Sequence, residues 1–318
     1  MSPSVGITSS VRAALLLFLA AAVTLPRLSV HPHAASAHRQ LKDAAAQLYY
    51  ANAHPYLEDS TESLLNQIPE LRGLQPAPDQ YALPMILKRT GQTVEAFFDD
   101  IVDVIAHEEI QRQKVNARGK TEVKELLQDN YLILLHRDEL PPRLEEYRTD
   151  ANGNRLDRAG SNTGLSVTSG FALKCIHFLP AYLLDSTFRY LGDQTLESRN
   201  TYVVAFAQRP TKATIMDTIS VDWGTVPILM QGIAWIDQAN FRIIRLRTDL
   251  LAPRLEIGLS RQTTDVTFTE VRLPDVAAPL WLPSKVTIVS LFGGNSFRNE
   301  HHYTAYQRFR VAVRMVPQ

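Results

Sequence analysis

Two groups of histidine and acidic residues are the places in this chain where metal or acid-base chemistry would be sought. One is the run His107-Glu108-Glu109, and the other is the pair His301-His302. The first lacks the second histidine of the helical zinc motif H-E-x-x-H, and neighbouring residues of a strand face opposite sides. We therefore predict a solvated strand end at His107-Glu108-Glu109, no metal site, and one inward histidine in the pair. A role for that histidine beside Glu300 or Tyr303 is an open alternative.

The chain has no local signature of nucleophilic or nucleotide chemistry. It contains no G-x-S-x-G elbow, no phosphate loop and no dinucleotide fingerprint, so no cofactor is predicted. Ser290 and Ser296 are isolated, and Gly293-Gly294 more simply serves a turn. An enzyme whose carboxylates and histidines converge only in the folded chain, such as a secreted hydrolase, stays open as the alternative function.

Cys175 is the only cysteine, so an intramolecular disulfide is excluded. It lies in the apolar stretch FALKCIHF at residues 171–178, which we interpret as a strand. We predict that Cys175 is a small buried packing residue. A catalytic thiol and an intermolecular bridge are the alternatives.

Residues 232–250, GIAWIDQANFRIIRLRTDL, predict a β-hairpin. With a loop over residues 238–240 and Asn240 left-handed, Trp235 lies opposite Ile243, and the small residues Gly232 and Ala234 lie opposite Leu246 and Ile244. Small residues opposite large ones suit a curved sheet with something packed into its hollow. Three charged residues then point the other way, toward water or a polar layer: Arg245, Arg247 and Asp249. The alternative is that one of these arginines fixes the sheet to a helix.

The N-terminus has the pattern of a secretory signal. An apolar run at 13–23 follows Arg12, is too short to span a bilayer comfortably, and is followed by the small residues Ala35-Ser36-Ala37. We predict a signal peptide at 1–37 and an exported protein, periplasmic or extracellular, without a stable membrane span after cleavage. An uncleaved anchor is the alternative. Removing this leader leaves 31 basic and 33 acidic residues, so the overall charge indicates neither a nucleic-acid partner nor an anionic-membrane partner.

In the rest of the chain the spacing of apolar residues changes once, from the period of 3.6 of a helix to the period of two of a strand. Residues 38–105 predict helices interrupted by turns at prolines such as Pro84, with one helix capped at Asp59 or Ser60 and another at Thr93. From about 106 to 318 the period is two, with hairpins such as 104–115 with 121–135. The prediction is an α+β fold, a large curved antiparallel sheet, half-barrel-like, covered by the N-terminal helices.

The strand pair FRYLGDQTLESRNTYVVAFAQRP at 188–210, followed by the hairpin, resembles the periplasmic lipoprotein-carrier superfamily of LolA, LolB and RseB. Matching positions are held by Arg199, Tyr202, Pro210, Trp235, Asp237, Phe241 and Arg245. The resemblance covers about 94–315. It departs from the family in the longer helical region before Thr93 and in Ser198, where a glycine is usual. The resemblance implies a non-enzymatic carrier or sensor of a lipid, acyl chain or lipoprotein.

The predicted ligand-binding residues lie on two strand faces that line the hollow of the sheet. They are Tyr202, Val204 and Phe206 on one strand and Ile244, Leu246 and Leu250 on the other. The alternative is that helix side chains fill this hollow and leave a dry core without a ligand.

Overall fold

The computed structural model describes residues 50–51, 53–136, 143–156, 170–214, 217–221 and 224–309. The predicted signal peptide and residues 38–49 of the predicted helical region lie outside these residues. No helix in the described part of the chain is both long and apolar enough to cross a membrane.

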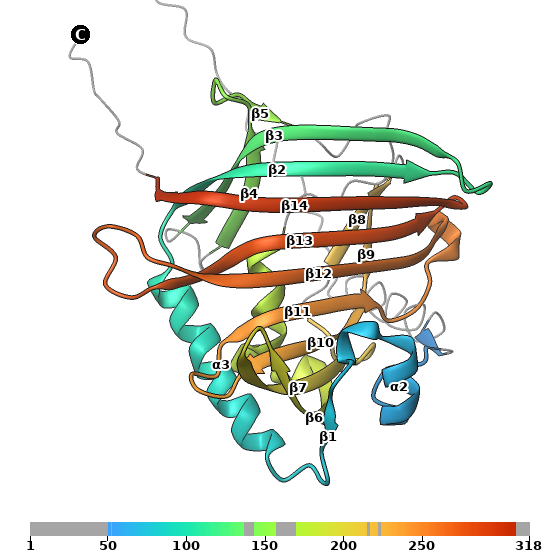
Figure 1. The fold of residues 1–318 in the computed structure, drawn as a ribbon. Helices are drawn as coiled ribbons and strands as arrows, with labels where there is room; N and C mark the ends of the chain where they lie inside the picture. The colour runs from blue at the N-terminus through green and yellow to red at the C-terminus, as the bar shows by residue number, and fades with distance from the viewer. Residues whose placement is uncertain are drawn as a thin grey trace, which may run out of the picture. The chain divides into compact units, whose positions relative to one another are not determined.

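A twelve-stranded antiparallel sheet forms most of the described chain, which confirms the predicted α+β class (Figure 1). Its spatial order is β1 (Gln75–Pro76), β6 (Ser186–Leu196), β7 (Arg199–Gln208), β10 (Met230–Asp237), β11 (Ile243–Leu250), β12 (Leu259–Val271), β13 (Leu280–Phe292), β14 (Asn295–Arg308), β2 (Val104–Val115), β3 (Thr121–His136), β4 (Arg143–Thr149) and β5 (Arg155–Leu156). A separate hairpin joins β8 (Asp217–Val221) to β9 (Gly224–Ile228). Because the order starts at β1 and ends at β5, the described sheet is open.

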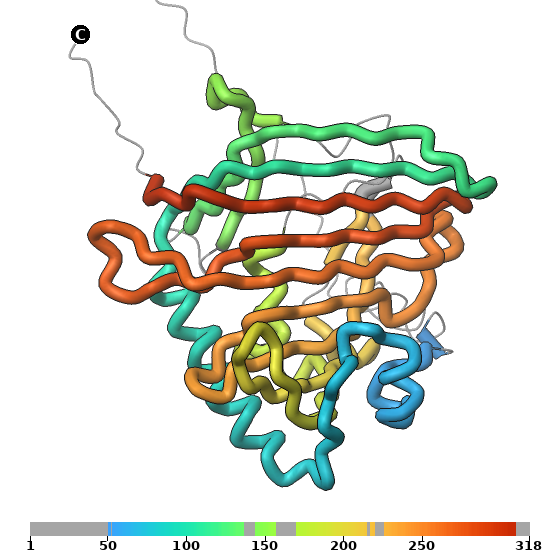
Figure 2. The backbone as a smooth tube through the Cα atoms, in the orientation of Figure 1, coloured from blue at the N-terminus to red at the C-terminus, as the bar shows by residue number. Residues whose placement is uncertain are grey.

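The last strand of the sheet lies beside the first long one (Figure 2). β14 pairs antiparallel with β2. Two consecutive runs of strands therefore become one sheet, β2 to β5 and, apart from the separate β8–β9 hairpin, β6 to β14. The predicted hairpin of 104–115 with 121–135 is confirmed as β2 with β3. Pro76 lies in β1, which is an edge strand of the sheet. The N–H that proline lacks is not needed for pairing on the open side of such a strand.

In the described part of the chain, two α-helices precede the first long strand, β2. Helix α2 (Thr61–Gln67) starts as predicted at Ser60, whose hydroxyl accepts a hydrogen bond from the Ser63 N–H. Helix α3 (Leu83–Asp100) starts ten residues before the predicted cap at Thr93. Pro84 does not break it, because proline is tolerated in the first turn, where its missing N–H has no helical partner.

The stretch FALKCIHF is a 3₁₀ helix rather than a strand. Element η2 (Ala172–Phe178) is followed by η3 (Pro180–Asp185), and shorter 3₁₀ turns form η1 (Pro69–Leu71) and η4 (Leu255–Ile257). Ala172, Cys175 and Phe178 are all buried, and residues three apart line up on one face of such a helix. A continuous apolar run does not distinguish a strand from a buried helix, which is why the prediction failed.

Cys175 is buried in the core, and burial raises the pKa of its thiol to about 12. Its Sγ–H donates to the carbonyl of Ala172. We expect a thiol reagent such as monobromobimane to modify the native protein far more slowly than the protein in urea, because the thiolate is the reactive species. Equal rates in the two states would show that Cys175 is accessible.

The sheet has an apolar core on each face. On the inner face, Val204, Phe206 and Leu246 belong to the same core as Ile86 and Val94 of α3. On the outer face a second core combines residues of α2, η1 and the sheet: Leu64, Ile68, Leu71, Val203, Ala205, Ile233, Trp235 and Ile244. The helices therefore pack on both faces, whereas the sequence suggested cover for one.

The β10–β11 hairpin forms as predicted, but its register differs. Trp235 pairs with Arg245, and Ala234 pairs with Leu246, because a bulge follows the turn. The left-handed residue is Phe241, with φ of 59°, rather than Asn240. The bulge moves Ile244 to the outer face, opposite to Leu246, so the prediction that they share a face is wrong.

The charged stripe of β11 meets η1 on the outer face. Arg247 Nη1 donates to Glu70 at 2.8 Å and its Nε donates to Asp249 at 2.8 Å, while Arg245 pairs with Asp265. Arg247 and Asp249 are both buried. These contacts support the alternative in which an arginine fixes the sheet to a helical segment.

Candidate functional site

The six predicted ligand-binding residues do not form one surface. Val204, Phe206 and Leu246 are completely buried in the inner core, where protein side chains fill the space. Tyr202 is partly exposed and its ring stacks on Phe241, with centroids 5.8 Å apart. The other two lie in different clusters: Ile244 is in the outer core and Leu250 is in the core beside β8 and β9. Ligand contact at these six positions stays a prediction.

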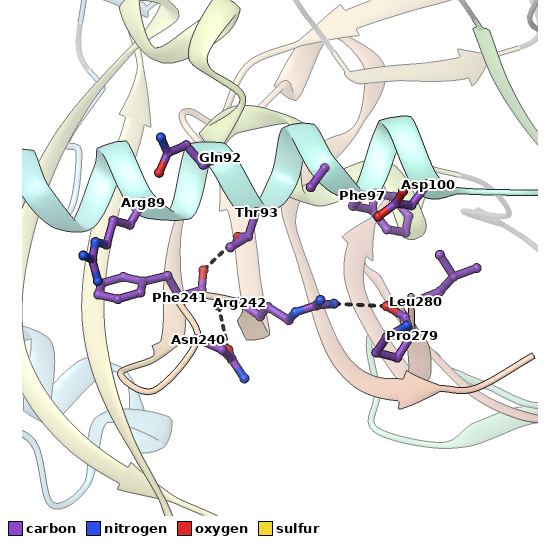
Figure 3. Close-up of a pocket in the computed structure, with 11 residues that line it drawn as sticks. Arg89, Gln92, Thr93, Phe97, Asp100, Asn240, Phe241, Arg242, Pro279 and Leu280 are labelled. Carbon is purple, nitrogen blue, oxygen red and sulfur yellow. Dashed lines mark hydrogen bonds between the residues drawn. The ribbon is translucent and has the colours of Figure 1, made fainter. Parts of the chain in front are cut away.

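An open pocket of about 400 Å³ lies where α3 crosses the β10–β11 turn and the start of β13 (Figure 3). Its lining comes from α3 (Arg89, Gln92, Thr93, Ala96, Phe97 and Asp100), from the turn (Asn240, Phe241 and Arg242), and from the first residue of β13 and the residue before it (Leu280 and Pro279). Its volume is within the range of small-molecule sites.

The left-handed residue Phe241 forms one wall of this pocket. The Thr93 hydroxyl donates to the Phe241 carbonyl at 2.9 Å, which ties the middle of α3 to the hairpin. On its other side the Phe241 ring stacks on Tyr202. The wall is therefore held both by a hydrogen bond and by aromatic packing.

Two arginines bring positive charge to the pocket. The Arg89 guanidinium lies 5.0 Å from the centroid of the Phe241 ring. Arg242 donates to the Pro279 carbonyl at 3.3 Å and lies over the Trp281 ring. Partial burial lowers the pKa of Arg242, although Glu270 and Asp100 act in the opposite direction, and an arginine stays protonated in water at any ordinary pH.

The pocket is thus both charged and apolar. Arg89 and Arg242 outnumber its one carboxylate, Asp100, while Phe97, Phe241 and Leu280 supply hydrocarbon surface. Such a lining suits a ligand with an acidic group at one end and an apolar remainder, because guanidinium groups pair with carboxylate or phosphate oxygens.

Glu108 does not lie at a solvated strand end. It is fully buried and accepts two hydrogen bonds from Arg148, from Nε at 2.6 Å and from Nη2 at 2.7 Å. His301 Nδ1 lies 2.8 Å from Glu108 Oε1. The prediction failed because Glu108 lies on the inward face of β2 with the apolar residues Val104 and Ala106. The alternation of side chains along a strand already indicates this position.

Glu108 and Arg148 form a fixed ion pair, and His301 contacts the same carboxylate. Burial alone would raise the pKa of Glu108. Arg148 and the hydrogen bond with His301 outweigh this effect and lower the pKa to about 2, so the carboxylate stays charged. The prediction of one inward histidine is confirmed, since His301 is buried and His302 is not. The described residues contain no group of three potential metal ligands. A substrate cannot reach the buried carboxylate in this conformation, so the cluster gives the hydrolase alternative no accessible acid-base pair.

His177 should make the protein less stable in weak acid. Burial beside Phe206 lowers its pKa to about 4, although Asp217 acts the other way. An unfolded chain, with a histidine pKa of about 6.5, takes up the proton first. This contribution to stability is therefore complete above pH ~6.5 and falls by about 1.4 kcal/mol per pH unit toward pH ~4.

Urea unfolding at several pH values tests this expectation. His177→Gln should flatten the pH dependence between those limits, while the exposed His107→Gln should leave it unchanged. A smaller slope should remain in His177→Gln, because burial also lowers the pKa of His301. Identical slopes for wild type and His177→Gln would contradict the assignment.

Comparison with known proteins gives a likeness of structure alone. No protein-family model matches the chain, and no curated protein matches it. An outer membrane lipoprotein-sorting protein domain from Vibrio parahaemolyticus has 14% identity over 72% of this chain and 93% of its own, with a TM-score of 0.34. A DUF1329 family protein from Desulfovibrio piger has 8% identity over 71% and 92%, with a TM-score of 0.35. A LolA superfamily protein from Nitrosomonas europaea has 11% identity over 70% and 94%, with a TM-score of 0.31.

Proposed function

We propose that the protein is an exported binder of an acidic amphiphile, a carrier or sensor of a lipid, acyl chain or lipoprotein, and that the ligand occupies the pocket beside α3. The observation that carries this proposal is the lining of the pocket. Arg89 and Arg242 lie beside the hydrocarbon surface of Phe97, Phe241 and Leu280. The predicted signal peptide supports export, and the resemblance noted in the sequence supports a lipidic ligand.

The two parts of the ligand have different roles in this proposal. The acidic head accepts hydrogen bonds from the arginines, and the chain lies along the aromatic and aliphatic wall. Burial of a methylene group contributes about 0.8 kcal/mol, so ten methylenes contribute about 8 kcal/mol before the costs of association. Dissociation constants in the micromolar range are therefore expected.

Titration of the exported protein with a fluorescent fatty acid tests the proposal. Arg242→Gln removes one cation of the pocket, and Ala96→Glu places a carboxylate at an exposed lining position of α3. Each should weaken binding by about tenfold, the effect of losing a charged partner of ~1.4 kcal/mol or more. The fatty alcohol of the same length should also bind more weakly than the acid.

Ala117→Glu is the matched control, because Ala117 is exposed in the β2–β3 turn and is not part of the pocket lining. It should bind as wild type does. Circular dichroism confirms that each variant is folded. Absence of saturable binding across several chain lengths would reject the proposed function, and equal binding by Ala96→Glu and Ala117→Glu would reject this pocket.

A further inference from the structure

We infer that the outward surface at the start of α3 docks on an anionic lipid bilayer. This docking surface consists of Tyr81, Pro84, Met85, Lys88 and Arg89, all of them exposed. Tyr81 is 89% exposed and Met85 is 40% exposed. The inference rests on the proposed function only for its purpose, which is to bring the mouth of the pocket to the source of its ligand.

The apolar end of the docking surface is held in place rather than loosely exposed. The Tyr81 N–H donates to Asp79 Oδ1 at 2.9 Å. The side chain of the preceding Gln80 bonds both the N–H and the carbonyl of Tyr190, each at 2.8 Å. A turn fixed at two neighbouring residues thus projects a tyrosine into solvent just before the start of α3.

The charges of α3 oppose its own dipole. Lys88 and Arg89 lie in the first half of the helix, whereas Asp99 and Asp100 lie in its last turn. Cations are favourable near the C-terminus of a helix and anions near its N-terminus, so this order does not serve the stability of the helix. It does place two cations directly beside Tyr81 and Met85.

This combination matches the interface of an anionic membrane. Tyrosine is enriched at the level of the lipid head groups, and methionine inserts among the chains beneath them. Lys88 and Arg89 can extend toward lipid phosphates, since long basic side chains keep their charged ends at the interface. No acidic residue belongs to the docking surface; the nearest in the sequence is Asp79, whose carboxylate is bonded to the Tyr81 backbone.

Arg89 links the docking surface to the pocket. It belongs to both, and its guanidinium lies over the ring of Phe241 (Figure 3). An acidic amphiphile in the head-group layer would meet Arg89 first, and Arg242 lines the same pocket. The surface and the pocket thereby form one route.

Sedimentation of the full exported protein with lipid vesicles tests this inference. Binding should be strong with vesicles of phosphatidylcholine plus phosphatidylglycerol, weaker with phosphatidylcholine alone, and reduced by salt. Lys88→Gln should weaken binding to anionic vesicles about fivefold, as expected for one basic contact. Met85→Glu should weaken it further, because it buries no apolar surface and repels the anionic lipid.

Leu126→Glu and Lys124→Gln are matched controls on β3, where Leu126 is 60% exposed. Equal vesicle binding by Met85→Glu and Leu126→Glu, or no vesicle binding by wild type, would overturn the inference; the second result would leave a protein partner for this surface. Titration with fatty acid in solution separates the two proposals. If Met85→Glu binds fatty acid normally while wild type ignores vesicles, only the docking inference fails.

Discussion

Replacing Arg148 with methionine is expected to lower the free energy of unfolding by about 3 to 5 kcal/mol. Arg148 and Glu108 are both buried, with two short hydrogen bonds between them. Removing the arginine leaves a charged carboxylate in the core, where no solvent reaches it, beside His301 and the hydroxyl of Tyr303. Without Arg148, which lowers the pKa of Glu108 in the native protein, burial favours the protonated carboxyl, so proton uptake by Glu108 is part of the cost of the substitution.

A double-mutant cycle distinguishes the charge from the packing. Arg148→Met with Glu108→Leu should lose less stability than the sum of the single variants, because the double variant buries no unpaired charge. Arg155→Met is the matched control, since its pair with Glu145 is at the surface and should contribute about 0 to 1 kcal/mol. A loss of less than 1 kcal/mol in Arg148→Met would show that the cluster is hydrated or mobile in solution.

Trp235→Ala is expected to destabilise the protein by about 3 to 5 kcal/mol. The side chain is completely buried in the outer core with Leu64 and Ile68 of the α2 region. Its Nε1–H donates to Gln194 Oε1 at 2.7 Å. The substitution removes a large apolar surface, leaves a cavity between the sheet and α2, and strands an amide oxygen.

Trp235→Phe separates these effects, because it keeps an aromatic ring but leaves Gln194 Oε1 without its donor. It should cost about 1 to 3 kcal/mol, less than the alanine variant. The midpoint and slope of urea unfolding measure both changes. An unchanged midpoint for Trp235→Ala would mean that this side chain is exposed in solution.

Local sequence patterns predicted the strands better than the way they pack. The hairpin of β2 with β3 follows from alternation, and α2 follows from the cap at Ser60. A bulge of one residue after Phe241 could not be read from the pattern, yet it reverses the face of Ile244. Pro84 shows the same limit. A proline is compatible both with a turn and with the first turn of a helix, so the residue alone does not distinguish the two.

The pocket could not be predicted, because it depends on a contact between residues 148 positions apart. The bond of Thr93 to the Phe241 carbonyl sets the distance between α3 and the hairpin. No periodicity contains that information. The position of Glu108 could have been found, since Val104 and Ala106 share its face, and a carboxylate among apolar inward residues requires a partner.

Photolabelling maps the bound ligand most directly. A fatty acid with a diazirine near the end of its chain is bound to the exported protein, irradiated, and located by mass spectrometry of peptides. We predict saturable labels on the peptides of Phe97, Phe241 and Leu280, competed by unlabelled fatty acid and weakened in Ala96→Glu. Labels confined to the peptides of Leu251 and Arg261, which line a separate pocket of about 410 Å³, would contradict this prediction.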